Sequence, residues 1–328
     1  MSELKKWDII HSDNTHYLIM DFNGEGCFGK VAQCFDLITF EMVAIKIHKD
    51  SDDPTIQREV AMLEAVRALD PHKKNILRFM ENIMFNNLSC LAFEMLDRSL
   101  WDLMDERNWE PLSTSEIGPV THRLLFAFEA LKNIGIMHTD LKPANIMLVQ
   151  DQADRLRSGP SSKQVTLGLP LSEYVDMWGV GCDMAFMYFG QHLFPDNCPY
   201  HWMKAMLQLF PAKWDHLEYE DWMAFLDLQN WCLHPDTKCR IIPRRALKHP
   251  FVTMVHLVDK VERGTYALSA IQFMTVSHQQ HFDGSYHDWV YEDSAFVKFY
   301  CHDSNTALMT DLQKDKRLNF TNLPRFKA

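Results

Sequence analysis

The sequence has no C-x-x-C pair, and its eight cysteines follow no spacing typical of a disulfide framework. Such scattered cysteines indicate a protein of a reducing compartment. Glycine and proline are sparse, with 12 and 14 copies in 328 residues, which excludes collagen-like and low-complexity chains. With 47% hydrophobic residues, the chain can bury a substantial core, either as one large domain or as two lobes with a tail.

Long apolar runs and an excess of positive charge are also missing. The most apolar run, residues 177–190, is too short to span a bilayer and carries Asp183, and residues 1–6 lead into no apolar signal segment. The formal net charge of −11 argues against a direct nucleic-acid partner, because phosphate binding requires a basic surface. We therefore expect an intracellular protein, nuclear or cytoplasmic, that contacts neither membranes nor nucleic acids directly.

The segment 138–145, which reads HTDLKPAN, places three residues suited to phosphoryl transfer in one loop. Asp140 can orient a hydroxyl group and accept its proton, and Lys142 can neutralise a phosphoryl group in transfer. The side-chain oxygen of Asn145 can bind Mg²⁺. We therefore take Asp140 and Lys142 as candidate catalytic residues and Asn145 as a candidate metal ligand.

A glycine-rich turn, GEGCFGKV, occupies residues 24–31. A G-x-G-x-x-G string alone is weak support, because the dinucleotide-binding fingerprint shares it. The dinucleotide version opens a helix, whereas here the glycines lead into Val31 and a second extended run. The pattern predicts a β-hairpin whose backbone N–H groups can approach phosphates closely, since glycine has no Cβ.

Lys46 lies in the apolar run 42–47, 17 residues after Gly29. A lysine that reaches the surface along its alkyl chain is the plain alternative. The helical pattern over residues 55–69 puts Glu59 on or beside the apolar stripe, where a carboxylate needs a cation. Lys46 is the natural partner of Glu59, and a solvated helix charge is the second interpretation.

Other segments supply the frame. Residues 1–16 are polar and are interpreted as a short leader, and strands are expected over 17–20, 30–34 and 42–47. A strand hairpin is expected over 83–85 and 89–95, and helices over 99–104 and 115–133.

In their order along the chain, these segments resemble a eukaryotic protein kinase of the serine/threonine type. The likeness continues at 176–182 (DMWGVGC), 235–241 (PDTKCRI) and 246–251 (ALKHPF), and it covers roughly residues 17–260. The strings at 145–149, 167–170 and 249–259 are also similar to the homeodomain-interacting protein kinase group.

The resemblance implies an α+β, two-lobed kinase fold, with a leader (1–16), a small β-rich lobe (17–96), a large helical lobe (97–260) and a C-terminal extension (261–328). It implies ATP and Mg²⁺ as ligands and a protein substrate or protein partner. Phe93 would stand at the back of the nucleotide pocket. The residues implied to bind ATP are Gly24, Glu25, Gly26, Cys27, Phe28, Gly29, Val31, Ala44, Lys46, Glu59, Glu94 and Leu96.

The sequence departs from the family after the catalytic loop. It contains no D-F-G and no A-P-E string, and 30 residues, many of them polar and turn-forming, separate Asn145 from Asp176. The Asp of D-F-G normally holds Mg²⁺ together with the Asn, so the departure puts Mg²⁺ binding in question and predicts impaired activity. Asp151 and Asp154 follow Asn145 too closely to replace the Asp of D-F-G readily.

Two further departures concern single residues. Thr139 stands where the family usually has Arg, so no basic pocket for a phosphorylated activation loop is expected. Arg240 would ordinarily pair with the Glu of A-P-E, near Gln164 in this sequence, and is expected to lack that partner.

Three hypotheses therefore stay open. The chain is an active serine/threonine kinase, a pseudokinase that acts as a nucleotide- or protein-binding scaffold, or a form of an active kinase that lacks one exon. Residues 261–328 match no motif and either pack on the large lobe or dock a partner. The histidines at 278, 281 and 287 fit no standard zinc spacing.

Overall fold

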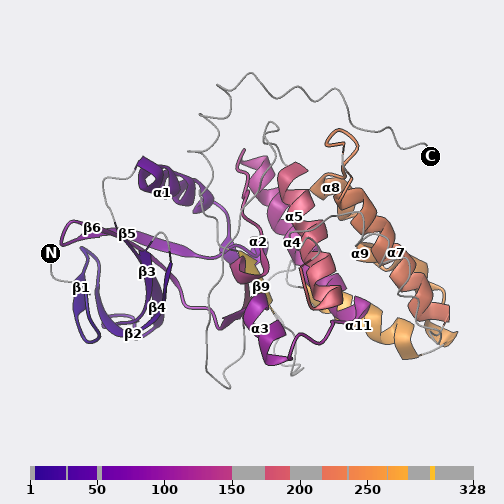
Figure 1. Cartoon of the computed structure of the whole chain (residues 1–328), viewed down its shortest axis with the longest axis horizontal. Helices are drawn as coiled ribbons and strands as arrows, with labels where there is room; N and C mark the ends of the chain where they lie inside the picture. Colours follow the sequence, from indigo (N-terminus) through magenta and orange to yellow (C-terminus); the bar gives the residue numbers. More distant parts are fainter. Residues whose placement is uncertain are drawn as a thin grey trace.

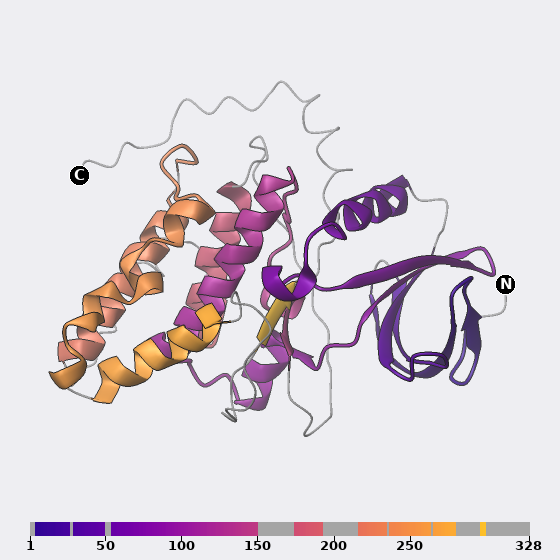
Figure 2. The same ribbon diagram turned by 180° about the vertical axis from the view of Figure 1, so that it is seen from behind.

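The computed structural model describes residues 4–26, 29–49, 54–149, 174–192, 216–234, 236–263, 265–279 and 296–299. A curled sheet forms a small lobe, and a bundle of helices forms a large lobe beside it (Figures 1 and 2). The predicted α+β, two-lobed fold is confirmed.

The small lobe is a six-stranded sheet in the order β1-β2-β3-β4-β6-β5, with antiparallel neighbours throughout. Its strands are β1 (Ile9–His11), β2 (His16–Gly26), β3 (Gly29–Asp36), β4 (Met42–His48), β5 (Phe79–Phe85) and β6 (Leu88–Glu94). β1 lies within the segment interpreted as a leader, and Ile10 is fully buried. The small lobe therefore begins earlier than the predicted residue 17.

The sheet curls until its two edges meet. The Tyr17 hydroxyl on β2 donates to Glu81 on β5 at 2.6 Å, and Ser12, just after β1, donates to the same carboxylate at 2.9 Å. Inside the curl, Val43, Ile45 and Ile47 of β4 join one buried apolar cluster. Because side chains alternate along a strand, the residues between them face the other way, toward helix α1 (Pro54–Val66).

The β5–β6 hairpin forms around Asn86 and Asn87, as predicted. Both residues have positive φ, 51° and 64°, which is the conformation that tight hairpin turns require and that asparagine tolerates. The short helix α2 (Pro71–Lys74) precedes this hairpin.

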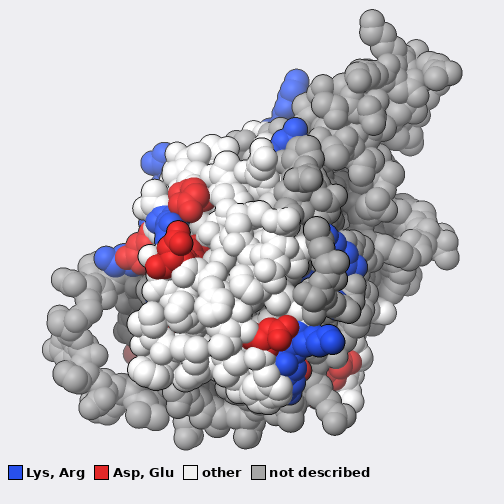
Figure 3. Space-filling model, turned by 90° about the vertical axis from the view of Figure 1, so that its left-hand side faces the viewer, with Lys and Arg blue, Asp and Glu red and all other residues white. Residues whose placement is uncertain are grey.

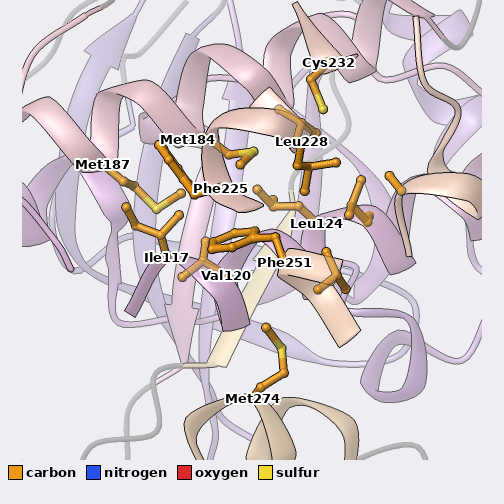
Figure 4. Close-up of a cluster of buried hydrophobic side chains, with 14 of the residues drawn as sticks. Ile117, Val120, Leu124, Met184, Met187, Phe225, Leu228, Cys232, Phe251 and Met274 are labelled. Atoms are coloured by element: carbon orange, nitrogen blue, oxygen red, sulfur yellow. The ribbon is translucent and has the colours of Figure 1, made fainter. Parts of the chain in front are cut away.

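The large lobe packs around a shared apolar core (Figure 4). Its helices are α3 (Leu100–Glu106), α4 (Thr114–Asn133), α5 (Tyr174–Phe189), α7 (His216–Cys232), α8 (Pro243–Ala246), α9 (Pro250–Thr253), α10 (Val255–Val258) and α11 (Thr265–Gln279), with 3-10 turns at Pro143–Asn145 and Val261–Arg263. Capping boxes start α3 at Ser99 and α4 at Ser113. Leu124 of α4, Phe225 of α7 and Phe251 of α9 are fully buried at the centre.

The C-terminal extension contributes to this lobe. The Tyr266 hydroxyl on α11 donates to Asp221 on α7 at 2.6 Å and lies 2.7 Å from the Thr114 hydroxyl on α4. A small sheet in the order β7-β8-β9 joins β7 (Arg98–Ser99), β8 (Ile146–Val149) and β9 (Phe296–Phe299). β9 runs antiparallel to β8, with Phe299 opposite Ile146. The segments of the extension that the structure describes therefore pack on the large lobe.

Two surface features concern the predicted partners. On the face at the small-lobe end, acidic and basic side chains are interspersed in small groups and much of the surface is uncharged (Figure 3). Within the described segments, no helix has the length and apolar character needed to cross a membrane.

Candidate active site

The glycine-rich segment forms the turn of the β2–β3 hairpin. Gly24 pairs with Val31, Glu25 with Lys30 and Gly26 with Gly29, so the strands remain in register up to the turn. Cys27 and Phe28, both predicted to bind ATP, lie outside the described residues. The hairpin agrees with the prediction that separated this segment from a dinucleotide-binding turn, in which a helix would follow.

Gly29 is required by its backbone. Its φ is +150°, and a Cβ at this position would lie 1.9 Å from the carbonyl oxygen of Ile47 on β4. No side chain fits that space. The close contact lets the base of the hairpin lie directly against β4, the strand that carries Lys46.

Lys46 and Glu59 form the predicted ion pair. Lys46 Nζ lies 2.7 Å from Glu59 Oε1 and 3.0 Å from Oε2, and the two residues are 9% and 2% exposed. Burial lowers the pKa of Lys46, and the Glu59 carboxylate opposes that shift by stabilising the ammonium. The pair joins α1 to β4 and holds a cation where a phosphate group could reach it.

The candidate adenine-binding residues lie along the same face. Ala44 is two residues before Lys46 on β4, and Val31 on β3 pairs with Lys46, so all three share one face of the sheet. Phe93 on β6 pairs with Ala44, is 3% exposed and packs against Phe79 with ring centroids 5.5 Å apart. Phe93 therefore closes this face from behind.

The connector that follows β6 begins at Glu94. The Glu94 carboxylate accepts from the Arg78 backbone N–H at 2.7 Å, which fixes the end of β6 against the start of β5. Leu96 is half-buried two residues later, on the segment that leads to β7 in the large lobe.

The catalytic loop brings its three candidate residues together. Lys142 Nζ lies 2.8 Å from Asp140 Oδ2. The Asn145 amide nitrogen donates to the Asp140 carbonyl at 2.8 Å and to Asp140 Oδ2 at 3.1 Å. The amide oxygen of Asn145 therefore points away from Asp140, where a cation could approach it. Both side chains of the Asp140–Lys142 pair remain partly exposed, at 25% and 31%.

Asp176 anchors this loop from beneath. It lies in the first turn of α5 and is 4% exposed, and its two carboxylate oxygens accept from the backbone N–H groups of His138 at 3.0 Å and Thr139 at 2.7 Å. Thr139 has φ +62°, which costs a non-glycine residue about 1–2 kcal/mol. The two charge-assisted bonds offset that cost and hold the loop in shape.

Asp183 is a second buried carboxyl group behind the loop. It lies two turns after Asp176 on α5, is 3% exposed, and its Oδ2 has no hydrogen-bond partner among the described residues. Burial raises the pKa of Asp183 well above its ordinary value, and the charge of Asp140 raises it further. The raised pKa favours the protonated, neutral form of Asp183. In the sequence, Asp183 stands out as a charged residue within an apolar run. No pattern in the sequence indicates that it lies near Asp140.

Comparison with known proteins agrees with this geometry. The family model described as "Protein kinase domain" matches residues 17–157. The chain is 27% identical over 367 aligned positions to homeodomain-interacting protein kinase 2 of Mesocricetus auratus, covering 84% of this chain and 31% of that protein. The chain is a eukaryotic protein kinase homologue, similar to the homeodomain-interacting group.

Two further relatives give the same result for this kinase homologue. It is 32% identical over 350 positions to homeodomain-interacting protein kinase 1 of Mus musculus, covering 78% of this chain and 29% of that protein. It is 35% identical over 218 positions to homeodomain-interacting protein kinase 4 of Homo sapiens, covering 58% and 35% respectively. The kinase homologue thus spans about a third of the length of these relatives.

The described residues of the kinase homologue do not by themselves form a Mg²⁺ site. Asn145 offers one neutral oxygen, and Asp140 is already bonded to Lys142 and to the Asn145 amide. Within the described ranges no three His, Cys, Asp or Glu side chains gather as a metal site would require. Asp151 and Asp154, the candidates to replace the Asp of D-F-G, lie outside the described residues.

Arg240 has partners other than the expected Glu. Its guanidinium donates to the carbonyl oxygens of Tyr174 and His234, and its Cζ lies 4.9 Å from the centre of the Trp178 ring. Backbone carbonyls and a tryptophan therefore satisfy the Arg240 guanidinium, and the expectation that it lacks the Glu partner stays a prediction. Gln164 lies outside the described residues.

Proposed function

We propose that this kinase homologue binds ATP in its small lobe and transfers the γ-phosphoryl group, at a reduced rate, to serine and threonine hydroxyls of a protein substrate. The buried bidentate pair of Lys46 and Glu59 carries the proposal. A lysine held in this way beside a glycine hairpin is suited to ATP phosphates.

The small lobe would hold the nucleotide. The backbone of the hairpin from Gly24 to Gly29 would cover the phosphates, and Lys46 would pair with them. Val31 and Ala44 would contact the adenine ring, and the backbone from Glu94 to Leu96 would bind its edge. Phe93 limits the depth of the pocket.

The large lobe would act on the acceptor hydroxyl. As the hydroxyl oxygen bonds to the γ-phosphorus, Asp140 accepts the hydroxyl proton, and the bond from phosphorus to the bridging oxygen breaks to release ADP. Lys142, 2.8 Å from Asp140, supplies positive charge to the transferring group. The Asp176 anchor keeps Asp140 in place during this step.

The rate is expected to be low because, among the described residues, Asn145 is the one predicted metal ligand. Mg²⁺ normally neutralises the charge that develops on the phosphates. The sequence has no D-F-G string, whose Asp normally binds Mg²⁺ together with the Asn. The length of the alignments supports a missing segment. An alignment of 367 positions exceeds the 328 residues of this chain, so the relative has residues with no counterpart here.

A nucleotide- or protein-binding scaffold without transferase activity is the second candidate. The same Lys46–Glu59 pair favours it, because nucleotide binding requires the small lobe and not the metal-binding turn.

A form of an active kinase that lacks one exon is the third candidate, and sequencing the transcript would identify it. In each case we place the protein inside the cell, in the nucleus or cytoplasm, in keeping with the free thiols at Cys34, Cys90, Cys182, Cys232 and Cys239.

Transfer of labelled phosphate from Mg-ATP to the chain itself and to a generic basic protein tests the proposal, with Asp140→Asn as the matched variant. We expect weak transfer that falls by roughly 10²–10⁴-fold in the variant, while nucleotide affinity stays unchanged. Equal, background transfer from both proteins with nucleotide still bound would favour the scaffold. Failure of both proteins to bind nucleotide would contradict the proposal.

A further inference from the structure

His48 makes a contact that the pair of Lys46 and Glu59 does not need. It lies two residues after Lys46 on the same face of β4 and is 3% exposed. Its Nε2 lies 3.2 Å from Glu59 Oε2, and its Nδ1 lies 3.2 Å from the carbonyl oxygen of Ser89 on β6. One imidazole thus joins α1 to the middle of the sheet.

Both neighbours of the ring can only accept hydrogen bonds if Glu59 is ionised. A neutral imidazole has one N–H and one lone pair, so either tautomer would direct a lone pair at an oxygen. The imidazolium form donates from both nitrogens and satisfies both contacts. Glu59 is held as a carboxylate by Lys46 Nζ, at 2.7 and 3.0 Å. The geometry therefore suits a buried cluster in which one carboxylate lies between two cations.

We propose that His48 is a positioning residue for the nucleotide site, which as a cation holds Glu59 and helix α1 in the arrangement that Lys46 requires. This inference rests on the proposed nucleotide-binding function. In protein kinases the position of this helix is a point of control, because the Lys–Glu pair must be in place for activity. Here a second bond from Glu59 to the sheet would help to keep the helix in place.

Among the described residues, the neighbours of the ring come from the sheet and from α1. Charged groups face it from β4 (Lys46) and from α1 (Glu59), and β6 presents the Ser89 carbonyl. On β3 its partner across the strands is Gly29, which has no side chain. A ring with a single N–H would direct a lone pair at one of these two acceptors, so its hold on Glu59 would be weaker.

The first measurement is ¹⁵N NMR of the full chain with labelled histidine, in which His48→Leu identifies the signal. We expect both ring nitrogens of His48 to be protonated at neutral pH, and we expect Glu59→Gln to shift the ring toward a neutral tautomer. A neutral His48 ring in the unsubstituted protein would overturn the proposal. This readout does not depend on nucleotide, so it stands even if the proposed function fails.

The second measurement is the affinity for ATP. We expect His48→Leu to weaken binding about tenfold, the size of one lost charge-assisted hydrogen bond. His48→Gln keeps a donor toward Glu59 and should recover part of the affinity. Amide exchange in α1 should be faster in the Leu variant. An unchanged affinity and exchange rate in His48→Leu would contradict the proposal.

Discussion

The two lobes hold their candidate functional residues in different ways. In the small lobe, Lys46, Glu59 and His48 are buried, and Lys46 and His48 both bond to Glu59. In the large lobe, Asp140 and Lys142 are partly exposed, and among the described residues no group of three His, Cys, Asp or Glu side chains gathers beside Asn145 to hold Mg²⁺. The difference supports the proposal that this protein binds nucleotide independently of phosphoryl transfer.

The largest effect is expected from breaking the small-lobe pair. Lys46→Met leaves the buried Glu59 carboxylate without its closest cation, and should lower the free energy of unfolding by about 3 kcal/mol and ATP affinity at least tenfold. Lys46→Met/Glu59→Gln is the control that removes both charges. Denaturant titration should show that the double variant recovers stability but not affinity. Equal stability of the single variant and the unsubstituted protein would contradict a buried pair.

A smaller loss is expected at the base of the glycine hairpin. Gly29→Ala places a Cβ against the Ile47 carbonyl and should cost roughly 2–3 kcal/mol in the free energy of unfolding. Gly135→Ala is the matched control, because Gly135 also has positive φ, +74°, but has nothing within 4 Å of the added Cβ. It should cost about 1 kcal/mol. Equal losses would mean that the contact between the hairpin and β4 does not contribute to the free energy of unfolding.

Much of this site was predicted from sequence because each part depends on local spacing. The hairpin, the strand with Lys46 and the loop from His138 to Asn145 are short, and their residue order fixes their geometry. The pairing of Lys46 with Glu59 was predicted because a carboxylate on a buried helix stripe needs a cation.

The remaining features depend on contacts between distant segments. Asp176 reaches the backbone of a loop 37 residues earlier, and His48 bonds to a carbonyl 41 residues later. No periodicity in the sequence indicates either contact. β1 was missed because three residues are too few to show a pattern. The pairing of β9 with β8 joins segments about 150 residues apart and has no local signal.

The large lobe offers a pH-dependent test at Asp183. In the folded state burial keeps Asp183 protonated above the pH at which it ionises in the unfolded chain, so its contribution to stability is lost as pH rises. Asp183→Asn cannot ionise. The melting temperature of the variant relative to the unsubstituted protein should therefore rise by a few degrees from pH 4 to pH 8. A difference that stays constant with pH would show that Asp183 is not held neutral.

The smallest effect is expected at β9. Val297→Pro removes a backbone donor from the strand that pairs with β8, and should lower the free energy of unfolding by about 1 kcal/mol. Hydrogen exchange should show faster exchange of amides in Ile146–Val149. Val297→Thr, which keeps the donor, is the control. If exchange in β8 is the same in both variants, the extension does not protect the strand next to Asn145.

We propose above all that the small lobe binds ATP without needing Mg²⁺ bound beside Asn145. The most direct measurement is the affinity of the full chain for ATP by calorimetry, with Mg²⁺ and with a chelator in its place. We predict affinities that agree within about threefold, less than 1 kcal/mol, because Lys46 and the hairpin bind the phosphates and the metal contacts are few. An affinity that rises more than tenfold with Mg²⁺ would contradict the account and would require a second carboxylate beside Asn145.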